Sequence, residues 1–330
     1  MAEKKTFKGV QVQLDFSLKV AELEIPKITD SDILIKVEAA AINPMDVYFA
    51  EGVLKNAVSL LPHVGGYEGS GTAVEVGKDH SSRIKVGDRV CFSGKWGAWG
   101  QYIAVPGDKV FHLHPENSFE EGASHFVNPV TLALMLRQVQ KEGHKAVIHS
   151  AGASSLGKMM IRYFKEHGIK TINLVRRDDV KEELTRLGAD YVLNIKDSDF
   201  EQQIEEIAKK ENATKFFDAI GGDFTVKVLR KMPPKSVVSV YGLLSKQTDI
   251  TVSLWDLFAG RTLNWFSLHD NYYSLSFDER VELADYIQKR LKTTFKSDIA
   301  KTFPLERATE AIAHSQEFAS SGKSLFKPWD

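Results

Sequence analysis

The sequence predicts an α/β protein of two domains, the first mainly β and the second built on a doubly wound parallel sheet. The chain has 330 residues, which is more than one hydrophobic core usually organises. Up to about residue 115, short β-rich runs are bounded by glycines. Beyond that point, short apolar runs alternate with helical segments, which is typical of a parallel sheet with right-handed crossovers.

The elements of the first part are predicted from strand and turn signals. Residues 33–39 have the composition of a strand, residues 71–77 form a second strand bounded by glycines, and residues 86–90 carry a turn into a third.

The elements of the second part follow one another in alternation. Strands are predicted at residues 146–148, 171–175, 191–193, 216–220 and 237–241. Helices are predicted at residues 158–166, 181–187 and 201–210, the second of them closed by Gly188. The C-terminal stretch is expected to hold helices at 278–291 and 305–314 and a short strand at 324–326.

Composition argues for a small-molecule partner. Lys and Arg number 43 against 44 Asp and Glu, so neither nucleic acid nor an anionic membrane surface is an expected partner. No run approaches the roughly 20 apolar residues of a membrane span. The single cysteine, Cys91, excludes an intrachain disulfide framework and a multi-cysteine metal site. A cytoplasmic location is expected, with an organellar one left open.

The strongest local signal is the run of small residues after the strand at 146–148. It reads A-x-x-S-x-x-G from Ala151 through Ser154 to Gly157 and leads into a predicted helix. Small side chains let the backbone approach a pyrophosphate, and a helix N-terminus supplies N–H donors and positive dipole. The alternative is a turn whose small residues only allow close packing and bind nothing.

Two arginines follow the next predicted strand. Arg176 comes 19 positions after Gly157 and is followed by Arg177. At this place a dinucleotide-binding unit has an acidic residue for NAD or a basic one for the 2′-phosphate of NADP. The pair therefore predicts NADPH, because guanidinium pairs well with phosphate. The alternative is an exposed basic turn before Asp178 and Asp179.

Two further strand ends are candidates for the same site. Ligands of open α/β sheets lie outside the carboxyl ends of the strands, so Gly221 and the run Tyr241-Gly242-Leu243 are expected to line the cofactor. For Gly222, a glycine that serves only the turn is as good an interpretation as one that lines the cofactor.

An ordered set of motifs resembles the zinc-free medium-chain dehydrogenases/reductases. These motifs are Asn43-Pro44-Met45-Asp46, Gly65-Gly66-Tyr67-Glu68-Gly69, residues 86–90, Val127-Asn128-Pro129-Val130-Thr131 and the loop at 151–157. The resemblance covers nearly the whole chain, and it is nearest to quinone oxidoreductases and mitochondrial-type 2-enoyl thioester reductases.

The resemblance implies a GroES-like β domain at residues 1–120, completed by residues 270–330, and a Rossmann NADPH-binding domain at 121–269. It also implies a homodimer formed through the Rossmann sheets. Within it, Asn128 would meet cofactor or substrate, Ser154, Ser155 and Leu156 the pyrophosphate, and Arg176 and Arg177 the 2′-phosphate. The other implied cofactor-binding residues are Asn43, Thr131, Ala151, Gly157, Gly221, Tyr241, Gly242, Leu243, Leu244, Phe266, Ser267, Leu268, His269 and Lys323.

The chain departs from the zinc-dependent members of the superfamily it resembles at the zinc ligands. Zinc-dependent relatives carry a Cys in the stretch held here by Asn43-Pro44 and a His at the position of Tyr67. Because thiolate and imidazole are the ligands a catalytic zinc needs, no metal is expected.

A second departure concerns the proton donor. The enoyl thioester reductases resembled here have a proposed donor tyrosine just after the glycine matching Gly52, where this chain has Val53 and Leu54. Tyr48 and Tyr67 are the nearest phenols and are the candidate catalytic acids; each is alternatively a packed aromatic.

The expected reaction is hydride transfer from NADPH to a quinone or an α,β-unsaturated double bond. One alternative is an NADPH-dependent 2-enoyl thioester reductase with a displaced proton donor. Another is an NADPH-binding structural or interaction protein with little turnover. Sites rather than folds separate these alternatives.

Overall fold

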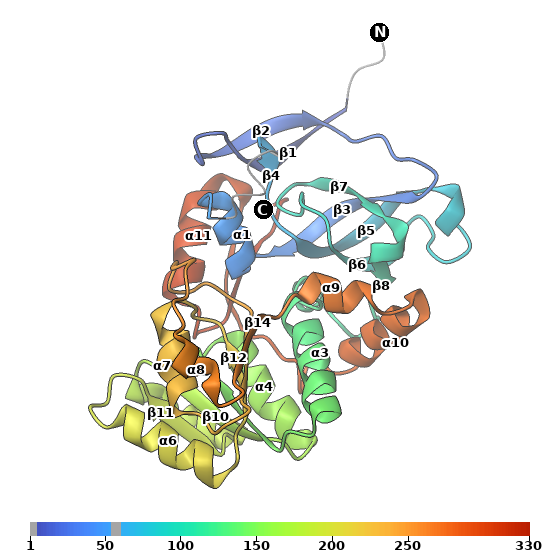
Figure 1. Ribbon diagram of the computed structural model, residues 1–330. Coiled ribbons are helices and arrows are strands. Elements are labelled where there is room, and N and C mark those ends of the chain that lie inside the picture. Colours follow the sequence, from blue (N-terminus) through green and yellow to red (C-terminus); the bar gives the residue numbers. More distant parts are fainter. Residues whose placement is uncertain (1–4, 54–60) are drawn as a thin grey trace. The chain divides into compact units, whose positions relative to one another are not determined.

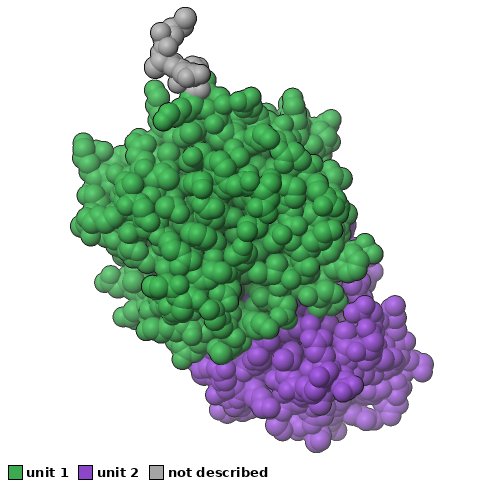
Figure 2. Space-filling model, turned by 180° about the vertical axis from the view of Figure 1, so that it is seen from behind, with its two compact units in different colours: residues 1–130, 275–330 green, residues 131–274 purple. Residues whose placement is uncertain are grey.

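The computed structural model describes residues 5–53 and 61–330, and Leu54 lies outside them. Within these residues the chain forms two compact units, coloured separately in Figure 2. One unit comprises residues 1–130 and 275–330, and the other residues 131–274. The domain limits expected at 120/121 and 269/270 stay predictions.

The first unit is built on two β-sheets over the described residues. A three-stranded sheet has the order β2-β1-β4, and a larger sheet has the order β15-β16-β3-β5-β6-β8, with β7 paired to β3. The strands are β1 (Thr6–Val12), β2 (Leu18–Glu24), β3 (Asp32–Ala41), β4 (His63–Val64), β5 (Glu68–Val76), β6 (Arg89–Ser93), β7 (Tyr102–Pro106), β8 (Val110–His112), β15 (Ile299–Phe303) and β16 (Lys323–Phe326). Alternation along β3 places Ile33, Ile35 and Val37 in a core that also holds Trp99 and Phe326.

Four helices of the described residues complete this unit. They are α1 (Pro44–Ala50), α2 (Phe119–Gly122), α10 (Phe277–Gln288) and α11 (Ala308–Glu317). Ser276 caps α10 by accepting a hydrogen bond from the amide of Glu279 at 3.2 Å. Short strands and helices from both ends of the chain therefore share one unit.

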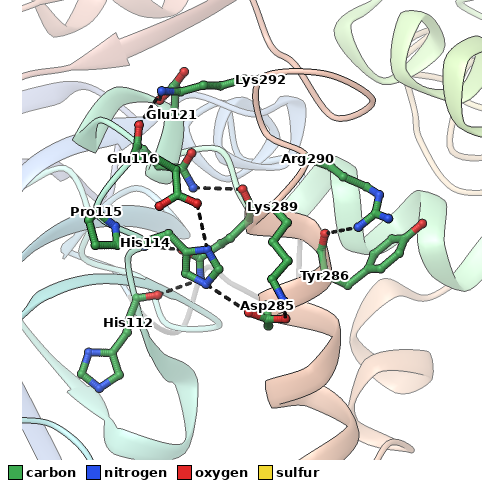
Figure 3. Close-up of polar contacts among 12 residues, drawn as sticks. His112, His114, Pro115, Glu116, Glu121, Asp285, Tyr286, Lys289, Arg290 and Lys292 are labelled. Atoms are coloured by element: carbon green, nitrogen blue, oxygen red, sulfur yellow. Dashed lines mark hydrogen bonds and ion pairs between the residues drawn. The ribbon is translucent and has the colours of Figure 1, made fainter.

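His114 fixes helix α10 to the end of the larger sheet (Figure 3). Its Nε2 lies 3.2 Å from Asp285 Oδ1, and its Nδ1 lies 3.4 Å from Glu116 Oε1. Gln288 at the end of α10 accepts a hydrogen bond from the His114 amide at 2.8 Å and donates one to the carbonyl of His112 at 2.7 Å. These contacts join residues far apart in the sequence.

The second unit is an open parallel sheet with the strand order β11-β10-β9-β12-β13-β14 in the described residues. The strands are β9 (Ala146–His149), β10 (Lys170–Val175), β11 (Tyr191–Asn194), β12 (Lys215–Asp218), β13 (Val237–Val240) and β14 (Thr262–Trp265). This order has its switch point between β9 and β12, where the chain turns from building one half of the sheet to building the other. The predicted α/β fold class is confirmed.

Helices connect the strands of this sheet (Figure 1). They are α4 (Ser155–Glu166), α5 (Lys181–Leu187), α6 (Phe200–Lys210), α7 (Asp223–Lys231), α8 (Leu254–Phe258) and α9 (Leu268–Tyr273). The helix α3 (Val127–Glu142) precedes β9. The apolar faces of α6 and α7 meet the sheet in a core that includes Ile148, Ile172, Phe216 and Val238. Within the described ranges, 5–53 and 61–330, none of the helices is both long enough and apolar enough to cross a bilayer.

Candidate functional site

The loop between β9 and α4 brings two stretches of backbone into close contact. Ala151 has a φ of 55°, which is the left-handed region. A Cβ on Gly157 would lie 2.3 Å from the carbonyl oxygen of Gly152. Only glycine fits at position 157 without moving that backbone. The predicted small-residue turn is therefore required by close packing within the loop itself.

The N-terminus of α4 is shaped to receive an anion. Ser154 caps the helix, its Oγ accepting a hydrogen bond from the Gly157 amide at 3.1 Å. The next residues, Ser155 and Leu156, open the first turn, which also carries Lys158, whose ammonium pairs with Glu183 Oε1 at 2.6 Å. Backbone N–H groups and the helix dipole at such a terminus favour a phosphate group. These residues fit the pyrophosphate of a dinucleotide.

Arg176 and Arg177 follow directly on the end of β10, next to the strand that leads into this loop. Both side chains are exposed. Arg177 Nε lies 3.3 Å from Asp179 Oδ1, and both groups are more than half exposed. An exposed ion pair of this kind contributes little to stability, so the guanidinium can be redirected to a phosphate at small cost.

The carboxyl end of β12 is organised by the buried carboxylate of Asp218. It accepts hydrogen bonds from Ser150 Oγ at 2.7 Å, Thr225 Oγ1 at 2.6 Å and the amide of Gly221 at 3.1 Å. Gly221 has a φ of 77°, a conformation that glycine adopts without strain. A Cβ on Gly242 would lie 2.7 Å from the carbonyl oxygen of Ala219. The two predicted glycines thus let the ends of β12 and β13 approach each other.

Tyr241 is held by a residue that the sequence did not single out. His149 is the last residue of β9 and is fully buried, and its Nε2 lies 2.7 Å from the Tyr241 hydroxyl. Burial lowers the pKa of His149 to about 3, so the imidazole is neutral at physiological pH. No local pattern connects positions 149 and 241, because the contact is made only when the sheet forms.

The remaining predicted residues of this unit surround the ends of β13 and β14. Leu243 is half-buried and Leu244 is exposed. Phe266 is buried and packs edge-on against Phe217. Ser267 caps α9 by accepting from the Asp270 amide at 3.1 Å, and it is followed by half-buried Leu268 and exposed His269.

In the other unit, Asn43 connects two buried charged groups. Its amide nitrogen donates to Glu68 Oε1 at 2.9 Å, and its Oδ1 accepts a hydrogen bond from the ammonium group of Lys323. Lys323 is buried, and burial lowers its pKa while the carboxylates of Glu68 and Asp46 oppose that shift. Two residues predicted to bind cofactor, Asn43 and Lys323, are therefore in direct contact although 280 positions separate them.

Asp46 adds a second carboxyl to this cluster. Its Oδ2 accepts a hydrogen bond from the amide of Asn43 at 2.7 Å, as expected of a residue in the first turn of α1. Its Oδ1 is buried and makes no hydrogen bond to the described residues. Burial, together with the charge of Glu68, raises the pKa of Asp46 to about 7.

The two candidate proton donors lie near one another in sequence but differ in surroundings. Tyr48, on α1, is buried, with 8% of its surface exposed. Tyr67 is half-buried and packs edge-on against Trp96, whose ring stacks on Phe49. Trp99, three residues further along the chain, is fully buried and donates to the carbonyl of Ala41.

Asn128 and Thr131 lie in the first turns of α3, and both are buried. The start of this helix is held by Glu68, whose Oε2 accepts hydrogen bonds from the amides of Phe126 and Val127, both at 3.0 Å. The helix dipole also favours a carboxylate at this N-terminus. Glu68 thus holds the start of α3 and the Asn43 side chain together.

The residues around Asn43 and Tyr67 do not fit a zinc ion. Zinc prefers thiolate, imidazole and carboxylate ligands in a tetrahedral set. From the described residues this place offers no thiolate or imidazole, and its two carboxyl groups, Asp46 and Glu68, accept hydrogen bonds from Asn43 beside the ammonium of Lys323. In residues 5–53 and 61–330, His, Cys, Asp and Glu side chains form no group of three or more suited to a metal. Burial raises the pKa of the Cys91 thiol, so the thiolate that binds metals is disfavoured there.

Comparisons with known proteins agree with this architecture. Residues 29–115 match the alcohol dehydrogenase GroES-like domain, and residues 155–270 match the zinc-binding dehydrogenase family. Mitochondrial enoyl-acyl-carrier-protein reductase of Mus musculus is 30% identical over 329 residues, covering 93% of this chain and 84% of that protein. Its counterpart in Arabidopsis thaliana is 30% identical over 281 residues, covering 83% and 74%.

A solved structure from Mesorhizobium loti, assigned as an NADPH:quinone reductase, has a TM-score of 0.86 to this chain at 30% identity. The match covers 99% of this chain and 100% of the other. A GroES-like domain together with a doubly wound parallel sheet defines an oxidoreductase of the dehydrogenase/reductase class. The chain belongs to the medium-chain dehydrogenase/reductase superfamily.

Proposed function

We propose that this chain is a zinc-independent, NADPH-dependent oxidoreductase that reduces a quinone or an α,β-unsaturated carbonyl compound. One observation carries the choice of cofactor: two exposed arginines follow β10, beside a loop whose glycine allows close backbone approach. The relative from Mesorhizobium loti, named for NADPH and quinone, supports it. When bound, the reduced nicotinamide supplies the hydride.

The chain's own residues would bind and orient the reactants. The amides of Ser155 and Leu156 would hold the pyrophosphate and the two arginines the 2′-phosphate. The residues from Tyr241 to Leu244 and from Phe266 to His269 would border the nicotinamide. Further contacts to the cofactor or substrate would come from Asn43, Asn128, Thr131 and Lys323. Hydrogen bonds to the acceptor carbonyl would stabilise the charge that develops there.

Reduction of a 2-enoyl thioester is the second candidate function. It is favoured by the 30% identity to the mitochondrial enoyl-acyl-carrier-protein reductases over most of both chains. This reaction needs a proton donor in addition to the hydride, for which Tyr48 and Tyr67 are the candidates. A quinone can take its protons from solvent, so its reduction depends less on either tyrosine.

The decisive experiment measures NADPH and NADH oxidation against a panel of quinones, enals and 2-enoyl thioesters. The first function is supported if the chain reduces quinones and if Tyr48→Phe and Tyr67→Phe each keep the wild-type rate within about twofold. Turnover of thioesters that one of these variants lowers by roughly 100-fold supports the second. Tight NADPH binding without turnover of any acceptor would contradict both and support a binding protein.

Cofactor choice is tested with the double variant Arg176→Ala/Arg177→Ala. A charge-assisted hydrogen bond contributes about 1.5–3 kcal/mol, so we expect the Kd for NADPH to rise roughly 10- to 100-fold. The Kd for NADH, which has no 2′-phosphate, should stay within about twofold. As a matched control, Arg186→Ala removes another exposed arginine of the same unit and should change neither value. Equal losses for both nucleotides would overturn the assignment of the arginines.

The chain is also proposed to form a homodimer through its parallel sheet. β14 is the last strand in the sheet order, so one of its edges is open within the described residues. Large apolar side chains are exposed here, on β14 and on α8: Leu254 at 86%, Trp255 at 79%, Phe258 at 80% and Trp265 at 57%. An open strand edge, with exposed aromatics on that strand and on the helix before it in the sequence, is suited to a second copy of the same surface.

A further inference from the structure

The contact between His149 and Tyr241 connects the two halves of the parallel sheet. β9 belongs to the half that continues into β10 and the two arginines, whereas β13 belongs to the half that follows the switch point. In a doubly wound sheet each half binds one mononucleotide. Arg176 and Arg177 assign the first half to the adenosine end. Tyr241, at the end of β13, therefore belongs to the nicotinamide end, whereas His149 comes from the adenosine half.

The backbone near Tyr241 is fixed by its neighbours. The Tyr241 amide donates to the carbonyl of Asp218 at 2.8 Å, and the amide of Leu244 donates to the carbonyl of Ala219 at 3.0 Å. Gly242 lies so close to Ala219 that a Cβ could not be accommodated. With the main chain fixed in this way, the direction of the phenol depends on its side-chain partner. His149 is such a partner, and its ring lies nearly parallel to the phenol, at an interplanar angle of 11°.

The hydrogen-bonding roles in this pair can be assigned from His149 alone. A neutral imidazole has one N–H and one acceptor nitrogen. Nδ1 of His149 is buried and has no hydrogen-bond partner among the described residues. Because a buried N–H without an acceptor is costly, the proton is assigned to Nε2, where it has one. Nε2–H then donates to the Tyr241 oxygen, which directs the phenol's own proton away from the imidazole and polarises it.

We propose that His149 is a positioning residue that orients the Tyr241 hydroxyl as a hydrogen-bond donor toward the carboxamide oxygen of the nicotinamide. This inference rests on the proposed function. His149 acts through Tyr241 and makes no contact of its own with the cofactor. It is therefore specific for the nicotinamide end and has no part in holding the 2′-phosphate.

Equilibrium binding of two probes tests the proposal, both by isothermal titration calorimetry. One probe is NADP⁺, and the other is 2′-phospho-ADP-ribose, which lacks the nicotinamide. His149→Leu and Tyr241→Phe should each raise the Kd for NADP⁺ roughly three- to tenfold and leave that for 2′-phospho-ADP-ribose unchanged. His149→Gln, which keeps an N–H donor near the place of Nε2, should restore the Kd to within about twofold.

The double variant shows whether His149 acts through Tyr241. His149→Leu in the Tyr241→Phe background should add no further loss of NADP⁺ affinity. Ser239→Ala, a change at another fully buried polar residue of the same sheet, should affect neither probe. Equal weakening of both probes, or additive losses in the double variant, would overturn the proposal. Failure of the wild-type chain to bind 2′-phospho-ADP-ribose would instead overturn the proposed function.

Discussion

Asp46 shows how burial of a single carboxyl makes stability depend on pH. Its pKa of about 7 in the folded chain compares with about 3.9 in an unfolded chain. Between these values the folded state binds more protons than the unfolded state, so stability falls as pH rises through this window. About three pKa units correspond to at most about 4 kcal/mol. We expect Asp46→Asn, which carries no charge, to remove this loss.

Urea unfolding at pH 5 and pH 8 measures the effect. The free energy of unfolding of Asp46→Asn relative to wild type should be higher at pH 8 than at pH 5. Asp278→Asn, at an exposed acidic residue in the first turn of α10, is the control and should follow the wild type at both values. The same pH dependence in wild type and Asp46→Asn would contradict the explanation.

At the residue scale, local signals could be found in the sequence and distant contacts could not. Arg176 and Gly157 were predicted because their roles depend on spacing within one βαβ unit. The bond from Lys323 to Asn43 and the bond from His149 to Tyr241 join positions in different parts of the chain. Histidine and tyrosine occur in many packed cores, so nothing in their local sequence indicated this pairing.

At the element scale, the helix α4 and the loop before it act as one structure. Gly157→Ala would force its Cβ against the Gly152 carbonyl, 2.3 Å away, and shift the first turn of α4. We expect a loss of about 1–3 kcal/mol in the free energy of unfolding. The Kd for NADPH should also rise, because the helix amides move away from the pyrophosphate.

Chemical denaturation and nucleotide titration test both effects, with Gly87→Ala for contrast. Gly87 has a φ of 95° and open space around its Cβ position, so alanine there strains the backbone without touching the loop. This variant should lose stability and keep its affinity for NADPH. Unchanged affinity in Gly157→Ala would show that the loop does not hold the cofactor.

Elements were predicted well where the residues that end helices and strands agreed with the hydrophobic periodicity. The helix α5 was predicted at residues 181–187 and closes at Gly188, whose φ of 109° is left-handed. By contrast, α3 was not predicted as a helix, because its buried residues are distributed around the helix without a clear polar face. β14 was also missed, since its sequence, Thr-Leu-Asn-Trp, leaves three of four side chains exposed and lacks a buried strand's pattern.

At the scale of the whole molecule, the two compact units do not follow one another along the chain. The first unit contains described residues from before and after the second unit, and residues 131–274 between them form the second. The C-terminal part rejoins the first unit through β16, which pairs with β3, and through α10, which is held by His114. Chain length and the change of pattern near residue 115 indicated two domains, but the return of the C-terminal segment came from the family resemblance.

The proposed homodimer can be tested at its apolar surface. If the surface formed by Leu254, Trp255, Phe258 and Trp265 is a dimer interface, wild-type protein should show twice the mass of one chain in light scattering at micromolar concentration. Burying each of these side chains contributes about 1.5–3 kcal/mol. Trp255→Glu/Phe258→Glu places charges in the interface and should yield monomers. Val86→Glu, at another exposed apolar residue but in the first unit, should leave the dimer intact. A monomeric wild-type protein, or a dimer that survives the double substitution, would rule out this surface.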